Sequence, residues 1–190
     1  MTNELDTPRP LVRGAPVVVG AVVLLVGAVV LVIALTREGG LPSDVAADYV
    51  AMMAGTLAPE HGIDDPQALS RTLALADPAF APRIASLAPE FRLMGGGAHR
   101  MRGRPAAVWF YRDRRSELVL GEAFVGTLGD VGTPEHVRSD RRPALHVFYK
   151  MTQTLVFWQE AQLVYVLVAT LPAERTIALA RRAASGARQP

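Results

Sequence analysis

The sequence predicts an α+β protein in which one transmembrane helix is followed by a single exported domain. Three observations support this prediction. An uncharged apolar stretch runs from Ala15 to Leu35, two segments after it have helical spacing of apolar residues, and strand-like runs follow from Glu90 onward. We expect an antiparallel sheet of four or five strands, with helices packed on one face of the sheet.

The apolar stretch contains no charged residue even when it is widened to Gly14 and Thr36. A helix rises ~1.5 Å per residue, so a stretch of this length spans roughly the 30 Å hydrocarbon core of a bilayer. A buried core helix is usually shorter and has a polar edge. A cleaved signal peptide has a shorter apolar core and a small-residue cleavage site, which the segment Leu35–Glu38 lacks. The sequence therefore predicts an uncleaved membrane anchor at residues 15–36.

The charges beside the anchor predict its orientation. Arg9 and Arg13 precede the stretch, whereas Arg37 follows it and acidic residues come soon after. Because Lys and Arg near a span favour the cytoplasmic side, we place the N-terminus in the cytoplasm. The C-terminal domain is then extracytoplasmic, on the outer side of the membrane. The expected division of the chain is a tail at 1–14, the span at 15–36, a hinge at 37–42, the domain at 43–185 and a tail at 186–190.

Composition excludes several classes of function. The chain has no cysteine, which rules out disulfides, thiolate zinc sites and cysteine nucleophiles. Its 20 basic and 18 acidic residues are nearly balanced, so there is no electrostatic case for binding nucleic acid.

Capping residues and apolar spacing predict three helices in the domain. Ser43 can cap the first helix, with Asp44 in its first turn near the positive end of the helix dipole. Asp65 can cap the second helix, and Pro66 suits its first position. The last helix begins near Leu171 and is followed by the C-terminal tail.

Alternating apolar residues predict the strands between the second and last helices. Phe91 and Leu93 begin a strand that the glycines at 95–97 break or bulge. Arg112–Ser116 forms a charged hairpin turn, and residues 126–143 form a long loop. The remaining predicted strands are Ala106–Tyr111, Glu117–Val125, His146–Met151, Thr154–Glu160 and Leu163–Ala169.

The sequence offers no recognisable catalytic motif. The glycines at 95–97 are not followed by the Lys-Ser/Thr of a phosphate-binding loop, and there is no Gly-x-Ser-x-Gly motif. The histidines lack a partner at helical spacing, so a metal site would need ligands that meet only in space. They are His61, His99, His136 and His146. We therefore expect no enzyme activity, no cofactor and no metal.

We expect six arginines to concentrate positive charge at one end of two neighbouring predicted strands: Arg100, Arg102, Arg104, Arg112, Arg114 and Arg115. They could contact an anion or lipid headgroups. The alternative is a solvated strand edge that discourages aggregation. Trp109 and Trp158 lie in predicted strands, and we expect at least one of them in the core. An exposed tryptophan would instead indicate a partner surface.

The anchor itself carries small residues at a spacing of seven. Gly20, Gly27 and Ala34 fall along nearly one helix face, where another helix could approach closely. The alternative is that the span is only a tether, since glycine is frequent in membrane helices.

Short motifs of the domain occur in a characteristic order. They are Asp65-Pro66, Phe80-Ala81-Pro82, Phe91-Arg92-Leu93-Met94-Gly95-Gly96, Gly103-Arg104-Pro105-Ala106-Ala107, Tyr111-Arg112, Phe157-Trp158, Tyr165-Val166-Leu167-Val168 and Leu171-Pro172-Ala173-Glu174. In this order, residues 65–182 resemble the extracytoplasmic sensor domain of bacterial single-pass membrane anti-sigma factors. Those proteins usually carry a zinc-binding domain that holds the sigma factor, placed before the span. Residues 1–14 contain no cysteine or histidine, so the resemblance covers only the sensor half.

Three functions remain open at this point. The first is a non-enzymatic membrane protein whose periplasmic domain binds a partner in envelope signalling or regulation, as the resemblance implies. The second is an accessory subunit that docks onto a larger membrane complex through its helix. The third is an exported ligand-binding protein or enzyme. The expected partners are membrane lipid and another membrane or periplasmic protein, or a second copy of the chain.

Overall fold

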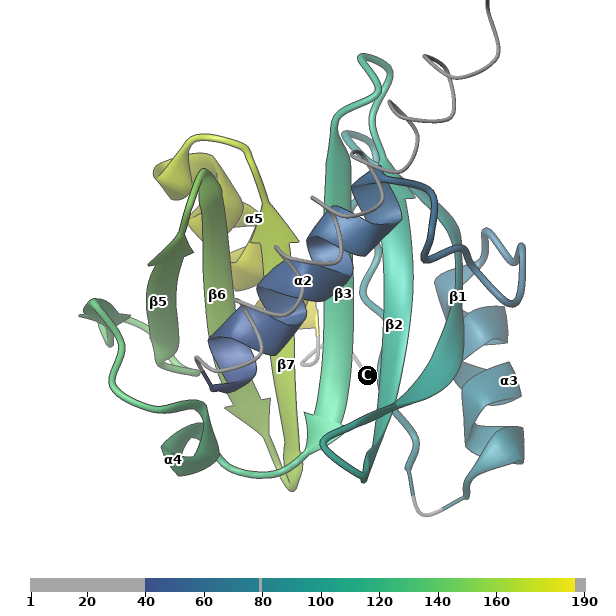
Figure 1. The fold of residues 1–190 in the computed structure, drawn as a ribbon, viewed down its shortest axis with the longest axis horizontal. Coiled ribbons are helices and arrows are strands. Elements are labelled where there is room, and N and C mark those ends of the chain that lie inside the picture. The colour runs from purple at the N-terminus through teal and green to yellow at the C-terminus, as the bar shows by residue number, and fades with distance from the viewer. Residues whose placement is uncertain (1–39, 79, 187–190) are drawn as a thin grey trace, which may run out of the picture. The chain divides into compact units, whose positions relative to one another are not determined.

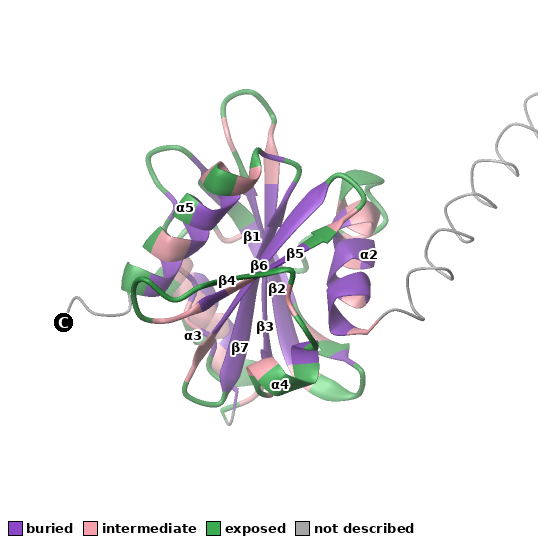
Figure 2. Cartoon of the chain, turned by 90° about the vertical axis from the view of Figure 1, so that its left-hand side faces the viewer, coloured by how far each residue is buried: buried purple, intermediate pink, exposed green. Residues whose placement is uncertain are grey.

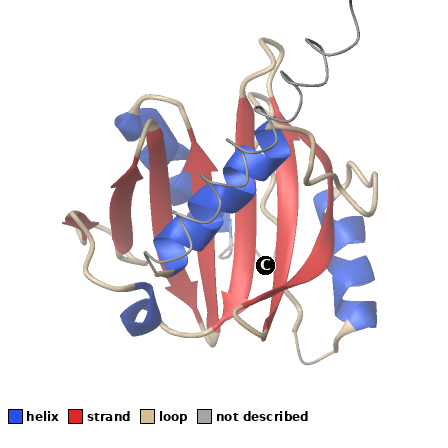
Figure 3. Ribbon diagram, viewed as in Figure 1, coloured by secondary structure: helices blue, strands red, loops and turns tan. Residues whose placement is uncertain are grey.

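A computed structural model describes residues 40–78 and 80–186 (Figure 1). Within these residues the chain forms seven strands and four helices, which Figure 3 distinguishes by colour. The helices are α2 (Leu41–Met53), α3 (Pro66–Ala76), α4 (Leu128–Val131) and α5 (Ala173–Ser185). The strands are β1 (Arg92–Met101), β2 (Arg104–Arg112), β3 (Leu118–Val125), β4 (His136–Arg138), β5 (Leu145–Lys150), β6 (Gln153–Glu160) and β7 (Leu163–Ala169).

All strands join one antiparallel sheet in the order β1-β2-β3-β7-β6-β5-β4. The α+β class and the antiparallel sheet are confirmed, but the expected number of four or five strands is wrong. The loop predicted at 126–143 contains α4 and the edge strand β4. The glycines at 95–97 do not end β1, which continues to Met101.

Helices cover both faces of the sheet, so the prediction of helices on one face is wrong. Figure 2 shows the sheet edge-on, with α2 on one side and with α3 and α5 on the other. Val45 and Tyr49 of α2 belong to one apolar core, whereas Leu69 of α3 and Leu179 of α5 belong to the second. The physical reason lies in the central strands, since every residue of β7 is buried. A sheet that is apolar on both faces needs cover on both sides.

The glycine run lets another segment pass along the edge of β1. The strand register shifts between Leu93 and Gly95, as the predicted bulge requires. Gly95 has φ 131°, and a Cβ there would overlap the backbone carbonyl of His61. His61 and Gly96 exchange two backbone hydrogen bonds of 2.8 and 3.0 Å. These glycines therefore allow close contact between backbones instead of ending the strand.

The helix starts agree only in part with the capping residues predicted from sequence. The Asp65 side chain accepts a hydrogen bond of 2.6 Å from the Ala68 N–H, and Pro66 is the first residue of α3, as expected. In contrast, Gly40 is the N-cap of α2, and Ser43 lies buried inside its first turn. Gly40 has φ 87°, a conformation that serine adopts rarely. The helix therefore begins inside the segment predicted as a hinge.

The described residues from Gly40 onward belong to one compact unit. None of the described helices is long and apolar enough to cross a membrane. The predicted span at 15–36 lies outside the described residues, and so does the predicted packing face of Gly20, Gly27 and Ala34.

Candidate functional site

A carboxyl group lies in the apolar layer beneath α2. Leu120 and Phe124 of β3 pack in the core on the α2 side, and Glu122 lies between them with the same alternation. Its cross-strand neighbours are Val108 on β2 and Val166 on β7. Glu122 is 0% exposed. This is an unusual position for an acidic residue, because charged side chains are almost never fully buried unless they are paired.

Two further side chains meet Glu122 from other elements. Asp48 comes from α2, one turn after Asp44, and His99 comes from β1 opposite Ala106. Ligand-type atoms of Asp48, His99 and Glu122 all lie within 4.8 Å of one another. We call these three residues the acid–histidine cluster. It joins one helix and two strands that are separated in sequence.

The described residues provide the cluster with few hydrogen-bond donors. Both carboxyl oxygens of Glu122 and Nε2 of His99 are buried, and no N–H group of the described residues donates to them. The hydrogen-bonding neighbour of Glu122 is the carboxyl group of Asp48. Burial raises the pKa of Glu122 well above its ordinary range, and the neighbouring carboxyl group of Asp48 raises it further. A hydrogen bond between two carboxyl groups forms only when one of them carries a proton. Burial lowers the pKa of His99, which favours the neutral imidazole.

The other histidines have different surroundings. His61 pairs with β1 through its backbone, and the ring of His136 lies against that of Tyr149 at a centroid distance of 5.9 Å. The Nδ1 atom of His146 is buried without a hydrogen-bond partner among the described residues, and burial lowers the pKa of this histidine. Of the four histidines, His99 is the one that the fold brings to two carboxyl groups.

The six arginines do not form one group. Arg100, Arg102 and Arg104 surround the β1–β2 turn, whereas the other three lie where β2 ends and in the β2–β3 turn: Arg112, Arg114 and Arg115. The nine-residue strand β2 separates the two turns by ~26 Å, because a strand rises ~3.3 Å per residue. Successive hairpin turns lie at opposite ends of a sheet. The prediction that all six arginines lie at one end of the two strands is therefore wrong.

The first three arginines already have partners. Arg102 forms an ion pair with Asp44 of α2, and Arg104 lies 3.2 Å from Asp130 of α4. Arg100 donates a hydrogen bond of 2.9 Å to the Gly103 carbonyl. These contacts hold the β1–β2 turn against α2 and α4. Contact with an anion or with headgroups remains a prediction for both sets of arginines.

Both tryptophans lie in the core on the side of α3 and α5. Trp109 and Trp158 are each 2% exposed. The ring of Tyr165 is stacked on Trp158 at 5.5 Å and meets Trp109 edge-on at 6.5 Å. The Trp158 Nε1–H donates a hydrogen bond of 2.9 Å to Oε1 of Glu160. Neither indole is available as a partner surface.

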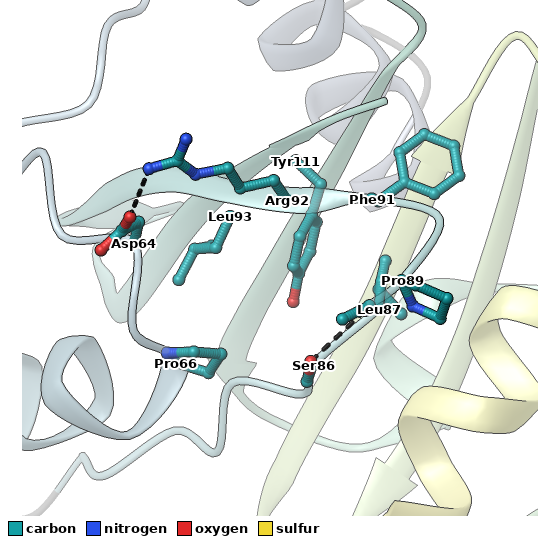
Figure 4. A pocket seen from close by; sticks show the side chains of 10 residues that line it. Asp64, Pro66, Ser86, Leu87, Pro89, Phe91, Arg92, Leu93 and Tyr111 are labelled. Carbon is teal, nitrogen blue, oxygen red and sulfur yellow. Dashed lines mark hydrogen bonds and ion pairs between the residues drawn. The ribbon is translucent and has the colours of Figure 1, made fainter. Parts of the chain in front are cut away.

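A cavity of about 180 Å³ lies between the start of β1 and the segment 86–89 (Figure 4). Its polar side chains satisfy one another or the nearby backbone. Arg92 pairs with Asp64, Ser86 Oγ accepts a hydrogen bond from the Ala88 N–H, and the Tyr111 hydroxyl donates to the Ala85 carbonyl. Burial raises the pKa of Tyr111 far above its ordinary value. The cavity therefore presents fewer unpaired polar atoms than the acid–histidine cluster.

Sequence reasoning missed Asp48 and Glu122 as site residues and treated His99 only as one of four histidines. The available signal was a single acidic residue inside the apolar run from Leu118 to Val125. No protein-family model matches the chain, and no curated protein or solved structure is significantly similar to it. The function of the site must therefore be argued from its own geometry.

Proposed function

We propose that this chain is a non-enzymatic, single-pass membrane protein whose periplasmic domain binds a protein partner in envelope signalling or regulation. The uncharged stretch from Ala15 to Leu35 supports the membrane anchor. The folded domain begins at Leu41, only a few residues later. The resemblance of residues 65–182 to anti-sigma-factor sensor domains supports the signalling role. A domain on so short a connection acts close to the bilayer.

The observation that carries the partner-binding role is the exposed edge of the sheet at β4. All three residues of β4 are exposed, and Val137 at its centre is 51% exposed. Tyr149 of β5 is 39% exposed and Met151 in the following turn is 79% exposed. We call Val137, Tyr149 and Met151 the β4 edge. An edge strand with apolar side chains is a template on which a strand of another protein can pair.

Co-purification from native membranes tests this role. The full-length tagged chain is solubilised, captured and compared with the variants Val137→Asp and Leu75→Asp. Leu75 is a matched control, because it is 84% exposed on α3, away from the β4 edge. We expect a protein of defined mass to be retained by the wild type and by Leu75→Asp, and lost from Val137→Asp. Equal retention by both variants would mean that the β4 edge does not bind the partner.

The accessory-subunit alternative is favoured by the small residues at 20, 27 and 34 of the predicted span. In that case Gly27→Leu removes the associated protein, whereas Val137→Asp does not. Val29→Leu is the control, because it places the same side chain on the opposite face of the same predicted helix. The two functions are thus separated by which substitution breaks the complex.

A further inference from the structure

The fold places an unsatisfied carboxyl group in its interior. An ionised carboxylate without a partner is unstable in apolar surroundings by several kcal/mol, so Glu122 must gain either a proton or a cation. Cross-strand valines and α2 surround it. No N–H group of the described residues donates to its oxygens, and its hydrogen-bonding neighbour is the carboxyl group of Asp48, which is itself an acid.

A proton satisfies the cluster only in part. One proton on Glu122 creates a single O–H donor, which can reach either His99 Nε2 or the carboxylate of Asp48. When that proton is shared with Asp48, the second oxygen of Glu122 and Nε2 of His99 still lack a donor among the described residues. A divalent cation, in contrast, accepts electron pairs from all three side chains at once and neutralises two negative charges.

We propose that Asp48, His99 and Glu122 bind one Zn²⁺ ion between α2 and the sheet. Zinc binds imidazole nitrogen and carboxylate oxygen at about 2.0–2.2 Å in tetrahedral sites, and where the protein supplies three ligands a water molecule takes the fourth position. Magnesium and calcium prefer oxygen ligands throughout, so the imidazole selects against them. His99 is suited to this role because its Nε2 is buried beside the two carboxyl groups with no hydrogen-bond partner among the described residues, so the Nε2 lone pair can coordinate a metal. Asp44, one turn before Asp48, is already paired with Arg102 and is not needed as a ligand.

The ion would connect three elements of the fold. Asp48 belongs to the first helix after the predicted anchor, and its ligand partners belong to β1 and β3. Because the three ligands come together only in the folded chain, zinc binds the native state and stabilises it. We therefore expect zinc to fix α2 on the sheet and to raise the melting temperature.

Calorimetric titration of the full-length chain in detergent tests the site. Metal is first removed with EDTA, and the chelator is then removed before ZnCl₂ or MgCl₂ is titrated in. We expect one Zn²⁺ per chain with a submicromolar Kd, a higher melting temperature with Zn²⁺, and no saturable binding of Mg²⁺. Absence of one-to-one zinc binding by the wild type would overturn the proposal.

Two ligand variants and one control show where the ion binds. Glu122→Gln and His99→Gln keep the approximate shape of each side chain but weaken coordination, and we expect each to lower zinc affinity by about 100-fold or more. His136→Gln, an exposed histidine outside the cluster, should leave the affinity unchanged.

Melting curves in EDTA show which variants are folded, and if Glu122→Gln does not fold, His99→Gln alone decides. Unchanged zinc affinity in a folded ligand variant would contradict the site. A metal-free wild type with a stable Glu122→Gln variant would indicate a proton shared with Asp48 instead.

Discussion

Gly121 has no room for a side chain, because the indole of Trp109 occupies the space beside it. The two residues are paired across β3 and β2. A Cβ at Gly121 would overlap Nε1 and Cε2 of Trp109 and would lie 2.9 Å from its Cδ1. These are atoms of a rigid ring that is itself buried against Tyr165. The substitution Gly121→Ala must therefore displace the indole or separate the two strands.

We expect Gly121→Ala to lower the free energy of unfolding by about 3 kcal/mol. Overpacking a core by single groups costs ~1–3 kcal/mol, and the upper end applies here because the contacting ring cannot bend away. For a domain of this size, 3 kcal/mol corresponds to a fall of roughly 10 °C in melting temperature. The assay is thermal unfolding of the full-length chain, followed by circular dichroism.

A control and a double variant make this prediction specific. Gly62→Ala adds the same methyl group where no heavy atom lies within 4 Å, so the melting temperature should hardly change. With Val in place of Trp109 the overlapping ring atoms are absent, so adding Gly121→Ala to the Trp109→Val variant should hardly lower its melting temperature further. If Gly121→Ala melts within two degrees of the wild type, the packing of β2 against β3 described above is wrong.

Three further predictions concern stability and topology. Trp158→Ala should lower the free energy of unfolding in urea by ~3–5 kcal/mol, because it removes a buried ring stacked on Tyr165; a midpoint equal to that of the wild type would refute this. Burial raises the folded-state pKa of Tyr111 above the unfolded value of ~10, so its contribution to stability is complete below pH 10 and is lost as the pH rises further. The stability of Tyr111→Phe should fall less steeply above pH 10, and parallel curves would contradict this. A reporter that is active only outside the cytoplasm should work when fused after Pro190, whereas activity of a cytoplasmic reporter there would reverse the proposed orientation.

The sequence predicts most strands because their apolar residues recur with a clear period. The pair Asp65-Pro66 likewise predicts the start of α3, since both residues have strong positional preferences. The three residues of β4 are too few and too exposed to give such a signal. The two-sided cover of the sheet follows from continuous apolar strands, such as the one from Leu163 to Ala169, because a strand without polar alternation buries both of its faces. The prediction of helices on one face does not use this signal.

The acid–histidine cluster could not be predicted from the sequence, for a different reason. Asp48, His99 and Glu122 lie on three elements, and no spacing rule links residues that meet only through the order of strands in a sheet. Glu122 alone carried a signal, because a charge between Leu120 and Phe124 in a buried strand needs a partner. That partner can be identified only from the three-dimensional arrangement of the helix and strands. The six arginines are the opposite case. They are close in sequence, but the fold places them in two groups at opposite ends of β2.

Photo-cross-linking at the β4 edge in living cells tests the central claim most directly. A photoreactive phenylalanine analogue replaces Val137 in the full-length chain, and a second chain carries it at Arg114 in the β2–β3 turn. Both positions are exposed, but only Val137 lies at the β4 edge. We predict one adduct of defined mass with another protein from Val137 and none from Arg114. No adduct from Val137, or the same adducts from both positions, would contradict a partner-binding domain that acts through this edge.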